Sequence, residues 1–435
     1  MNNFQKRIIA IVFGVSSGVT VMEFKIKEKP REILRADIPW EKSTNGAICM
    51  PTRWLATFFQ MIKNYATSGD VITGATWGAD LHWSSPSIQH YQSVQQKHLE
   101  MVKSIVPPLE IYLNTGGVNV DIYQPYAQLE AIKKRWPQIK YGSKAIIPFN
   151  DHITWYLSEE RKHDPNMLNS QGLLAKNWRS VYEKIFEPNI VARIRPWALF
   201  QEQELITESS GIIIVPFSHD SLYSRITGFA ECESLLWTGS WFGSAHQVDP
   251  SIKPNEKTFE AQISFEGLGS KRSAITNVKM FGAIYKELLR RLGLSYKKAS
   301  EYSLPFMRTE QESHLSDEDI RELPNDATSG ADFIMKKAEK KNRVVPFFIK
   351  TVAYAGIQKD KEVAKTLDLE QKNEIGVTGG FAENEAFLEA LRVMGYKVYI
   401  PSFAAISTHA GLAADALVRL GVASTYNSAL KKFVN

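Results

Sequence analysis

Two strand-turn-strand segments about half a chain apart constrain the fold more than any other feature of this sequence. The first is "RIIAIVFGVSSGVTVMEFKI" (Arg7–Ile26), in which a Gly-Ser-Ser-Gly turn joins two apolar runs. The second is "SLLWTGSWFGSAHQV" (Ser234–Val248), with a Thr-Gly-Ser turn at the same place. Both patterns are typical of β-hairpins. A repeated unit at this distance predicts a duplicated fold with a cleft between its halves.

The segments after each hairpin predict a layered α/β arrangement. Apolar residues at helical spacing in Arg53–Ala66 precede a strand and polar turn within Asp70–Trp83. Near the end, Glu374–Ile400 reads as a strand, a Gly-Gly turn, a helix capped near Asn384 and another strand. Alternating strands and helices favour an α/β class. For a chain of 435 residues we expect two domains, 1–228 and 229–435.

Two further segments carry specific structural expectations. The apolar run Gly211–Phe217 predicts a single buried strand that ends in a polar Ser-His-Asp-Ser turn. The Ser-, Glu- and Asp-rich stretch Thr309–Gly330 predicts a surface excursion.

Composition excludes several classes of protein. The chain is 44% hydrophobic, and its apolar runs are shorter than the roughly 18 residues that span a bilayer. The only two cysteines, Cys49 and Cys232, fit a reducing compartment, and Met1–Lys6 opens no signal peptide, so we expect a soluble cytoplasmic protein. The net charge of +5 comes with no nucleic-acid recognition motif. We therefore expect small-molecule partners, with no nucleic acid or membrane, and the oligomeric state stays open.

The two hairpin turns are candidate phosphate sites. Backbone N–H groups of a Gly/Ser turn converge on an anion, with hydroxyl groups as extra donors. Ser16, Ser17 and Gly18 form one candidate cradle. Thr238, Gly239 and Ser240 form the other. An ordinary hairpin turn is the alternative for each, and no G-x-x-x-x-G-K-[ST] motif occurs anywhere.

Two more segments carry weaker signals. The turn "TGGFAEN" (Thr378–Asn384) would let a nucleotide approach the backbone, although a Gly-Gly turn also commonly ends a buried strand. In "TWGADLHW", Asp80 is of the kind that binds a polyol, whereas Trp77 is equally explained as core packing.

The sharpest feature is "SHDS" (Ser218–Ser221), a carboxylate beside an imidazole and two hydroxyls at the end of a buried strand. Asp220 could accept the proton of a substrate hydroxyl as that hydroxyl attacks phosphorus. The alternatives are that Asp220 caps the following helix and that His219 is a structural histidine. A serine hydrolase is poorly supported, because no G-x-S-x-G elbow exists.

Taken in chain order, these segments resemble the FGGY carbohydrate kinases, and within them the rhamnulokinase-like branch. The family patterns D-x-G-A-S-S-G-R, T-W-G-x-D, S-H-D-T, S-G-T-W and G-G-G-x-x-N correspond to Val12–Val19, Thr76–Asp80, Ser218–Ser221, Thr238–Trp241 and Gly379–Asn384. Weaker likenesses lie in Thr115–Ile132, Asn166–Leu174 and Gln262–Gly267. The resemblance covers nearly the whole chain.

The resemblance implies two ribonuclease H-like (actin-like ATPase) domains in which ATP, with Mg²⁺, phosphorylates a ketose such as L-rhamnulose or L-fuculose. It implies that Asp220 is the catalytic base. The expected sugar contacts are Gly78, Asp80, His219, Ser221 and Asn277. The expected nucleotide contacts are Ser16, Ser17, Gly18, Thr238, Gly239, Ser240, Gly379, Gly380 and Asn384. No side chain is assigned as a metal ligand.

Three departures from the family pattern favour a second interpretation. Val12 stands where the family usually has an Asp that helps organise the metal, Val19 replaces an Arg, and Phe381 replaces a glycine beside the nucleotide. The segment Ser87–Lys97 also lacks the D-x-R that often follows the substrate strand. Charge neutralisation dominates phosphoryl transfer, so these losses would weaken catalysis. The alternative is a catalytically impaired pseudokinase that binds a sugar or nucleotide as a sensor.

Overall fold

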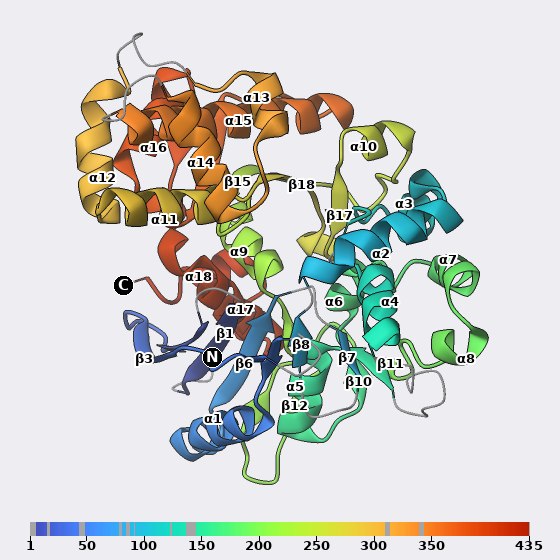
Figure 1. Cartoon of the computed structure of the whole chain (residues 1–435). Helices are drawn as coiled ribbons and strands as arrows, with labels where there is room; N and C mark the ends of the chain where they lie inside the picture. Colours follow the sequence, from blue (N-terminus) through green and yellow to red (C-terminus); the bar gives the residue numbers. More distant parts are fainter. Residues whose placement is uncertain are drawn as a thin grey trace.

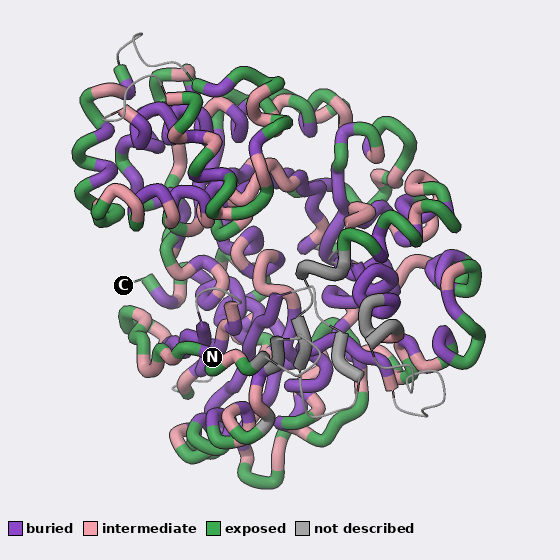
Figure 2. The backbone as a smooth tube through the Cα atoms, viewed as in Figure 1, coloured by how far each residue is buried: buried purple, intermediate pink, exposed green. Residues whose placement is uncertain are grey.

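Two mixed β-sheets and the helices that cover them form the framework of the protein (Figure 1). The computed structural model describes residues 6–14, 18–42, 48–77, 81–83, 88–90, 92–121, 124–135, 145–308, 314–338 and 343–434. Buried residues form the interior of the protein, and exposed residues lie mainly on its periphery (Figure 2). Within the described residues, no helix combines the length and the apolar character that crossing a membrane requires.

The first sheet is built on the predicted N-terminal hairpin. β1 (Ile8–Gly14) and β2 (Gly18–Phe24) pair antiparallel over their whole lengths. β3 (Arg31–Ala36) continues the sheet beyond β2, and β6 (Val71–Thr76) lies parallel to β1 on the other side. The far edge consists of β12 (Ile206–Thr207), β13 (Ile213–Ile214) and β14 (Ser218–His219), and the last two both run parallel to β6.

The second sheet repeats this arrangement around the second predicted hairpin. β15 (Ser234–Thr238) and β16 (Phe242–Gln247) pair antiparallel. β18 (Ser273–Lys279) and β17 (Ser264–Glu266) follow beyond β16, while β19 (Glu374–Gly379) and β20 (Lys397–Tyr399) lie parallel beyond β15. Each sheet therefore has a central hairpin, an antiparallel third strand and a parallel fourth strand, as the duplicated pattern predicts.

A helical insertion follows β6 and has its own apolar core. Its helices are α2 (Gln92–Ile105), α3 (Pro108–Asn114), α4 (Pro125–Arg135), α6 (Pro165–Ser170), α7 (Trp178–Ile185) and α8 (Pro188–Val191). Leu99, Tyr126, Val181 and Ile190 are among the buried side chains that pack together there. Short strands β4 (Glu41–Lys42), β5 (Ile48–Met50), β7 (Leu81–Trp83), β8 (Ile88–His90), β9 (Ile146–Pro148), β10 (Lys162–His163) and β11 (Ala198–Leu199) form three small sheets.

The two faces of the first sheet are covered by different helices. Alternate β1 residues Ile9, Ile11 and Phe13 pack with α1 (Thr52–Tyr65) and α5 (Phe149–Ser158). The other face packs with α9 (Asp220–Phe229), α17 (Ser407–Arg419) and α18 (Tyr426–Leu430). Helices from the end of the chain thus complete the core around its first strands. The predicted domain boundary at residue 228 stays a prediction.

Helix α9 lies between the two sheets (Figure 1). Leu222 and Ile226 on α9 pack in the core of the first sheet, whereas Phe229 at its end packs against the second. A Cβ atom at Gly228 would lie 2.5 Å from Leu235 of β15, so glycine permits this close contact. Helix α9, which begins at Asp220, therefore packs against both sheets.

The outer face of the second sheet carries the largest apolar core. The helices of this core are α11 (Phe281–Leu292), α12 (Tyr296–Ser303), α14 (Ala327–Lys337), α15 (Val344–Thr366) and α16 (Glu385–Val393). The short helix α10 (Glu256–Glu260) precedes a separate, smaller apolar cluster that includes Ala261 and Ile263. The expected surface excursion over Thr309–Gly330 is wrong in part. Leu315 and Leu323, on either side of α13 (Asp317–Glu322), are buried in this core. These two leucines attach the segment to the core even though most of its residues are polar.

The expected single strand over Gly211–Phe217 is also wrong in part, because the structure divides it into β13 and β14. Pro216 falls between them, and a proline has no N–H to give to a sheet. Despite the break, β13 and β14 both pair with β6. The Phe217 ring between them packs on Gly74 so closely that a Cβ atom on Gly74 would lie 2.0 Å from it.

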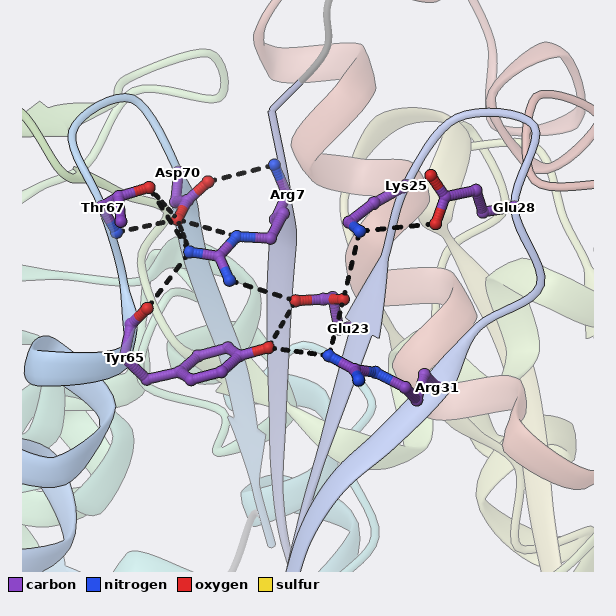
Figure 3. A network of polar contacts seen from close by, with 8 residues as sticks. All are labelled: Arg7, Glu23, Lys25, Glu28, Arg31, Tyr65, Thr67 and Asp70. Carbon is purple, nitrogen blue, oxygen red and sulfur yellow. Dashed lines mark hydrogen bonds and ion pairs between the residues drawn. The ribbon is translucent and has the colours of Figure 1, made fainter.

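A polar network closes the end of the first sheet where β1 and β6 begin (Figure 3). The Arg7 guanidinium donates to Asp70 at 2.5 Å and to Glu23 at 3.3 Å. Tyr65 donates its hydroxyl to Glu23 at 2.6 Å, and Arg31 donates to the same carboxylate at 3.2 Å. The side chains of Asp70 and Glu23 are each 5% exposed. This network lies at the opposite end of β6 from the Ser-His-Asp-Ser turn, so it serves the fold.

We expect this network to make stability fall in acid. Burial raises the pKa values of Glu23 and Asp70. The hydrogen bonds that these carboxylates accept, from Tyr65 to Glu23 and from Arg7 and Thr67 to Asp70, together with the nearby cations lower the pKa values by more. The pKa of Glu23 therefore lies below its ordinary 4.5, and that of Asp70 below 3.8. A carboxyl group whose pKa is lower in the folded state than in the unfolded state stabilises the folded state at pH values above its unfolded-state pKa. This stabilisation is lost as the pH falls through the folded-state pKa. Both groups act in the same direction, so their effects on the pH dependence add. Urea unfolding between pH 7 and pH 3 measures the effect.

The variant E23Q should show a flatter loss of unfolding free energy with acid than the wild type. Glu28→Gln is the matched control, because Glu28 bonds only at the surface, with its side chain 59% exposed. An E23Q curve parallel to that of the wild type would contradict the prediction.

Candidate functional site

Asp220 stands where a strand of the first sheet meets the helix between the sheets. β14 ends at His219, and Asp220 is the first residue of α9. Ser218 pairs with Ala75 of β6, which also pairs with Val12 of β1. Three parallel strands therefore end at one edge of the sheet, which is where open α/β sheets bind ligands.

The Asp220 carboxylate is placed as a partly accessible base. Its side chain is 32% exposed, Oδ1 accepts the N–H of Ser221 at 2.7 Å, and His219 Nε2 lies 3.5 Å from the same oxygen. His219 occupies the N-cap position of α9, so Asp220 is not the capping residue that the alternative interpretation supposed. Burial raises the pKa of Asp220 above its ordinary value, and the nearby His219 opposes that rise. Such a carboxyl group suits general base catalysis.

Four side chains beside Asp220 contact one another in a ring. His219 Nδ1 lies 3.6 Å from Glu266 Oε2, which accepts from Arg225 Nη2 at 2.5 Å. Arg225 Nη1 donates to Ser221 Oγ at 3.2 Å, and Ser221 Oγ lies 3.2 Å from His219 Nε2. Burial disfavours the charged forms of Glu266 and His219. Nevertheless, Arg225 and His219 lower the pKa of Glu266 to about 2. Glu266 in turn raises the pKa of His219.

Sequence reasoning missed Arg225 and Glu266. Arg225 follows Ser221 by four residues, a spacing that places both on one helix face and was a usable signal. Glu266 lies in the segment Gln262–Gly267, which resembles the family without a functional assignment, and no local pattern indicates that β17 reaches α9.

Ser218 is engaged in a buried network below the site. Its hydroxyl donates to Asp164, whose main-chain N–H donates to Asp151 Oδ1 at 2.9 Å. Asp151 Oδ2 lies 2.5 Å from His163 Nδ1, and burial raises the pKa of Asp164 to about 6. These side chains are at most 1% exposed. Ser218 therefore anchors the end of β14 and is not accessible as a nucleophile.

The first hairpin turn is described only in part. Ser16 and Ser17 lie outside the described residues, as do Gly78 and Asp80, so the roles predicted for them stay predictions. Gly18 has φ of 74°, and a Cβ there would lie 2.3 Å from the Ala36 carbonyl oxygen, so only glycine fits.

Apolar packing accounts for two of the departures from the family pattern. Val12 packs at the edge of the apolar core formed with α9 and α17, and Val19 is fully buried on the α1 face. The two valines near this hairpin thus join the cores on the two faces of the sheet.

The second hairpin turn uses part of its hydrogen-bonding capacity internally. Thr238 Oγ1 donates to the Thr378 carbonyl at 2.5 Å and accepts from Phe381 N at 3.0 Å, so this hydroxyl holds β15 to the Gly-Gly turn. The Gly239 N–H donates to the Trp241 carbonyl at 2.9 Å. Gly239 and Ser240 are both exposed. The phosphate contacts predicted for Gly239 and Ser240 stay predictions.

The Gly-Gly turn combines an open surface with a buried anchor. Gly379 has φ of 83°, and Gly380 has open space over its Cα. Phe381 is 4% exposed and packs 5.1 Å, between ring centroids, from Tyr285. The phenylalanine that replaces a family glycine therefore points into the core and leaves the backbone at Gly380 accessible. This geometry fits close approach of a nucleotide.

Two asparagines from the expected set have different surroundings. Asn384 is buried and is the N-cap of α16, as the sequence predicts, where Oδ1 accepts from Phe387 N at 3.1 Å. Its Nδ2 donates to the Tyr285 hydroxyl at 3.1 Å, so both ends of this amide are engaged. Asn277 is half-buried on β18 opposite Gly243. Any ligand role of Asn277 stays a prediction.

The described residues offer no metal site made of three or more protein side chains. Mg²⁺ in kinases is held by one or two carboxylates together with substrate phosphates. Val12 offers no carboxylate at the end of β1, and within the described ranges no group of three or more His, Cys, Asp or Glu side chains could hold a metal.

Known proteins resemble this chain in structure. No protein-family model and no curated protein sequence matches it. Ligand-bound xylulose kinase from Lactobacillus acidophilus superimposes with a TM-score of 0.73 at 13% identity, over 99% of this chain and 92% of that one. Gluconate kinase from the same organism superimposes with a TM-score of 0.74 at 13% identity, over the same shares of the two chains. Plasmodium falciparum glycerol kinase with ADP superimposes with a TM-score of 0.71 at 12% identity, over 98% of this chain and 92% of that one. The chain has the two-domain actin-like ATPase fold of the FGGY carbohydrate kinases.

Proposed function

We propose that this protein is an ATP-dependent carbohydrate kinase that phosphorylates a hydroxyl group of a ketose such as L-rhamnulose or L-fuculose. The observation that carries the proposal is the placement of Asp220, a partly exposed carboxylate at the start of the helix between two actin-like sheets. The solved structures with this fold include xylulose and glycerol kinases. The likeness to the rhamnulokinase-like branch rests on the sequence motifs and is the reason for proposing a ketose as the substrate class.

Asp220 would act as general base. The oxygen of a sugar hydroxyl forms a bond to the γ-phosphorus of ATP, the bond from that phosphorus to the oxygen of ADP breaks, and the hydroxyl proton passes to the Asp220 carboxylate. A carboxylate at this position typically accelerates such a transfer by about 10²–10⁴-fold. His219 and Ser221 flank the base and are the proposed sugar contacts, together with Gly78, Asp80 and Asn277.

The nucleotide would lie against the second sheet. ATP supplies the γ-phosphoryl group, and the magnesium that accompanies it offsets phosphate charge. Ser240 and the exposed backbone at Gly239 and Gly380 would contact it, with the turn held in place by Thr238 and Asn384. Gly379 permits the turn through its positive φ of 83°. Ser16, Ser17 and Gly18 are the proposed phosphate contacts of the first domain.

A pseudokinase that senses a sugar or nucleotide is the second candidate. The observation that favours it is Val12, which places an apolar side chain where a metal-organising acid is expected. Such a protein would bind its ligand without transferring phosphate.

Release of ADP with ATP and magnesium across a panel of ketoses tests the proposal. The panel contains L-rhamnulose, L-fuculose, D-ribulose and D-xylulose, and a sample without sugar measures simple hydrolysis. We expect release that depends on one or two of these sugars. No release with any sugar, combined with a raised melting temperature in ATP or a ketose, would support the pseudokinase instead. Equal release without sugar would indicate a hydrolase.

A further inference from the structure

The ring of side chains beside Asp220 joins two parts of the chain that are distant in sequence. His219, Ser221 and Arg225 belong to the β14–α9 junction, whereas Glu266 ends β17 of the second sheet. The Arg225 side chain is 1% exposed and that of Glu266 is 10% exposed. The second sheet thus contributes a carboxylate to the surroundings of the proposed catalytic base.

Stability alone is a weak explanation for this pair. A buried ion pair usually gains little over apolar residues of the same size, because both charges lose their hydration. Arg225 is also incompletely satisfied, since its Nε has no hydrogen-bond partner among the described residues. Glu266 Oε2 faces two cationic side chains, with Arg225 at 2.5 Å and His219 at 3.6 Å. The shared carboxylate oxygen brings the buried pair within ion-pair distance of the imidazole.

We infer that Glu266 and Arg225 are positioning residues, a buried ion pair that holds the His219 imidazole against the carboxylate of Asp220. This inference rests on the proposed function. Arg225 fixes Glu266 and also holds Ser221 through its hydroxyl. Glu266 in turn keeps His219 turned toward the base. Phosphoryl transfer needs Asp220 ionised, and a cation 3.5 Å away favours the ionised form.

The charged groups that face His219 define what each substitution changes. They are Asp220 from its own turn, Glu266 from β17 and Arg225 from α9. Burial disfavours the imidazolium, Glu266 and Asp220 favour it, and Arg225 opposes it. Removal of Glu266 therefore leaves His219 with a stronger preference for the neutral form. For Asp220 two effects then oppose each other, because a charged His219 lowers the pKa of Asp220 whereas the Glu266 carboxylate raises it.

Nuclear magnetic resonance of histidine-labelled protein tests the inference without any need for turnover. We expect His219, assigned by its absence from H219Q, to titrate above the ordinary histidine pKa of 6.5 in the wild type and at lower pH in E266Q. An unchanged His219 titration in E266Q would overturn the inference. The double variant R225M/E266Q removes both charges, so it decides the question if E266Q fails to fold, and its His219 should also titrate at lower pH.

Kinetics with the ketose found in the panel give a second readout. E266Q should lower kcat by on the order of 100-fold through misplacement of the base, with KM for ATP little changed. Glu23→Gln is the matched control, because Glu23 is also a buried carboxylate paired with arginines, but at the other end of the sheet. Equal kinetics in E266Q and E23Q would overturn the inference. Wild-type protein that phosphorylates no ketose would reject the proposed function, while the His219 titration would still decide the positioning.

Discussion

Replacement of Asp220 by asparagine should abolish sugar-dependent release of ADP, with kcat lower by about 10²–10⁴-fold. The amide has nearly the shape of the carboxylate but does not accept the hydroxyl proton. Because burial already disfavours the charge at this position, the melting temperature of D220N should equal or exceed that of the wild type. The measurement is ADP release at saturating ATP and ketose, with thermal unfolding of the same samples.

The pH dependence of the wild type gives an independent check on this base. Asp220 must be ionised to accept a proton, and its pKa lies above the ordinary 3.8. We therefore expect kcat to fall in acid at a pH above that value. Asp249→Asn is the control, because Asp249 is exposed on the surface of the second domain. Wild-type kcat in D220N would show that another group takes the proton.

Asp415→Asn should have the largest effect on stability, a loss of about 3–5 kcal/mol in the free energy of unfolding. Asp415 is 1% exposed and accepts from Lys271 Nζ at 2.6 Å and from Arg419 Nε at 2.8 Å. Its substitution leaves two buried cations without their carboxylate. The hydroxyls of Tyr223, at 3.2 Å, and Tyr426, at 3.1 Å, also donate to it. Urea unfolding at neutral pH measures the loss.

Lys271→Met should cost less than D415N, because Arg419 continues to neutralise Asp415. The double variant K271M/D415N should cost less than the sum of the two single losses, since the two residues share one contact. Exactly additive losses would contradict a direct interaction. Arg35→Met is the matched control, because the side chains of Arg35 and its partner Glu32 are 60% and 43% exposed and surface pairs contribute little.

Local patterns in the sequence predict much of this fold. Both hairpins, the helix from Arg53, the Gly-Gly turn and the Asn384 cap follow from alternation, turn chemistry and capping preference over a few residues. The break at Pro216 was also predictable from its missing N–H, and the apolar run around it concealed the signal. These features depend on neighbours in sequence.

The remainder depends on contacts between distant segments. Helix α17 is buried on nearly all sides, and its residue types do not indicate which sheet it covers. The partners of Ser218 and His219, namely Asp164 and Glu266, come from other elements. Sequence reasoning therefore identified the groups at the proposed reaction centre and missed the side chains that hold them in place.

The return of α17 to the first sheet has a consequence for how the protein is made. His409 donates to the Thr20 carbonyl across 389 residues of sequence, and Ala410 and Leu417 pack with Ile8 and Ala10. At translation rates of about 5–20 residues per second, the first sheet waits roughly 20–80 s for these helices. During that time its apolar face lacks its natural cover. The nascent chain is thus a natural client for chaperones that shield apolar strands until synthesis reaches α17.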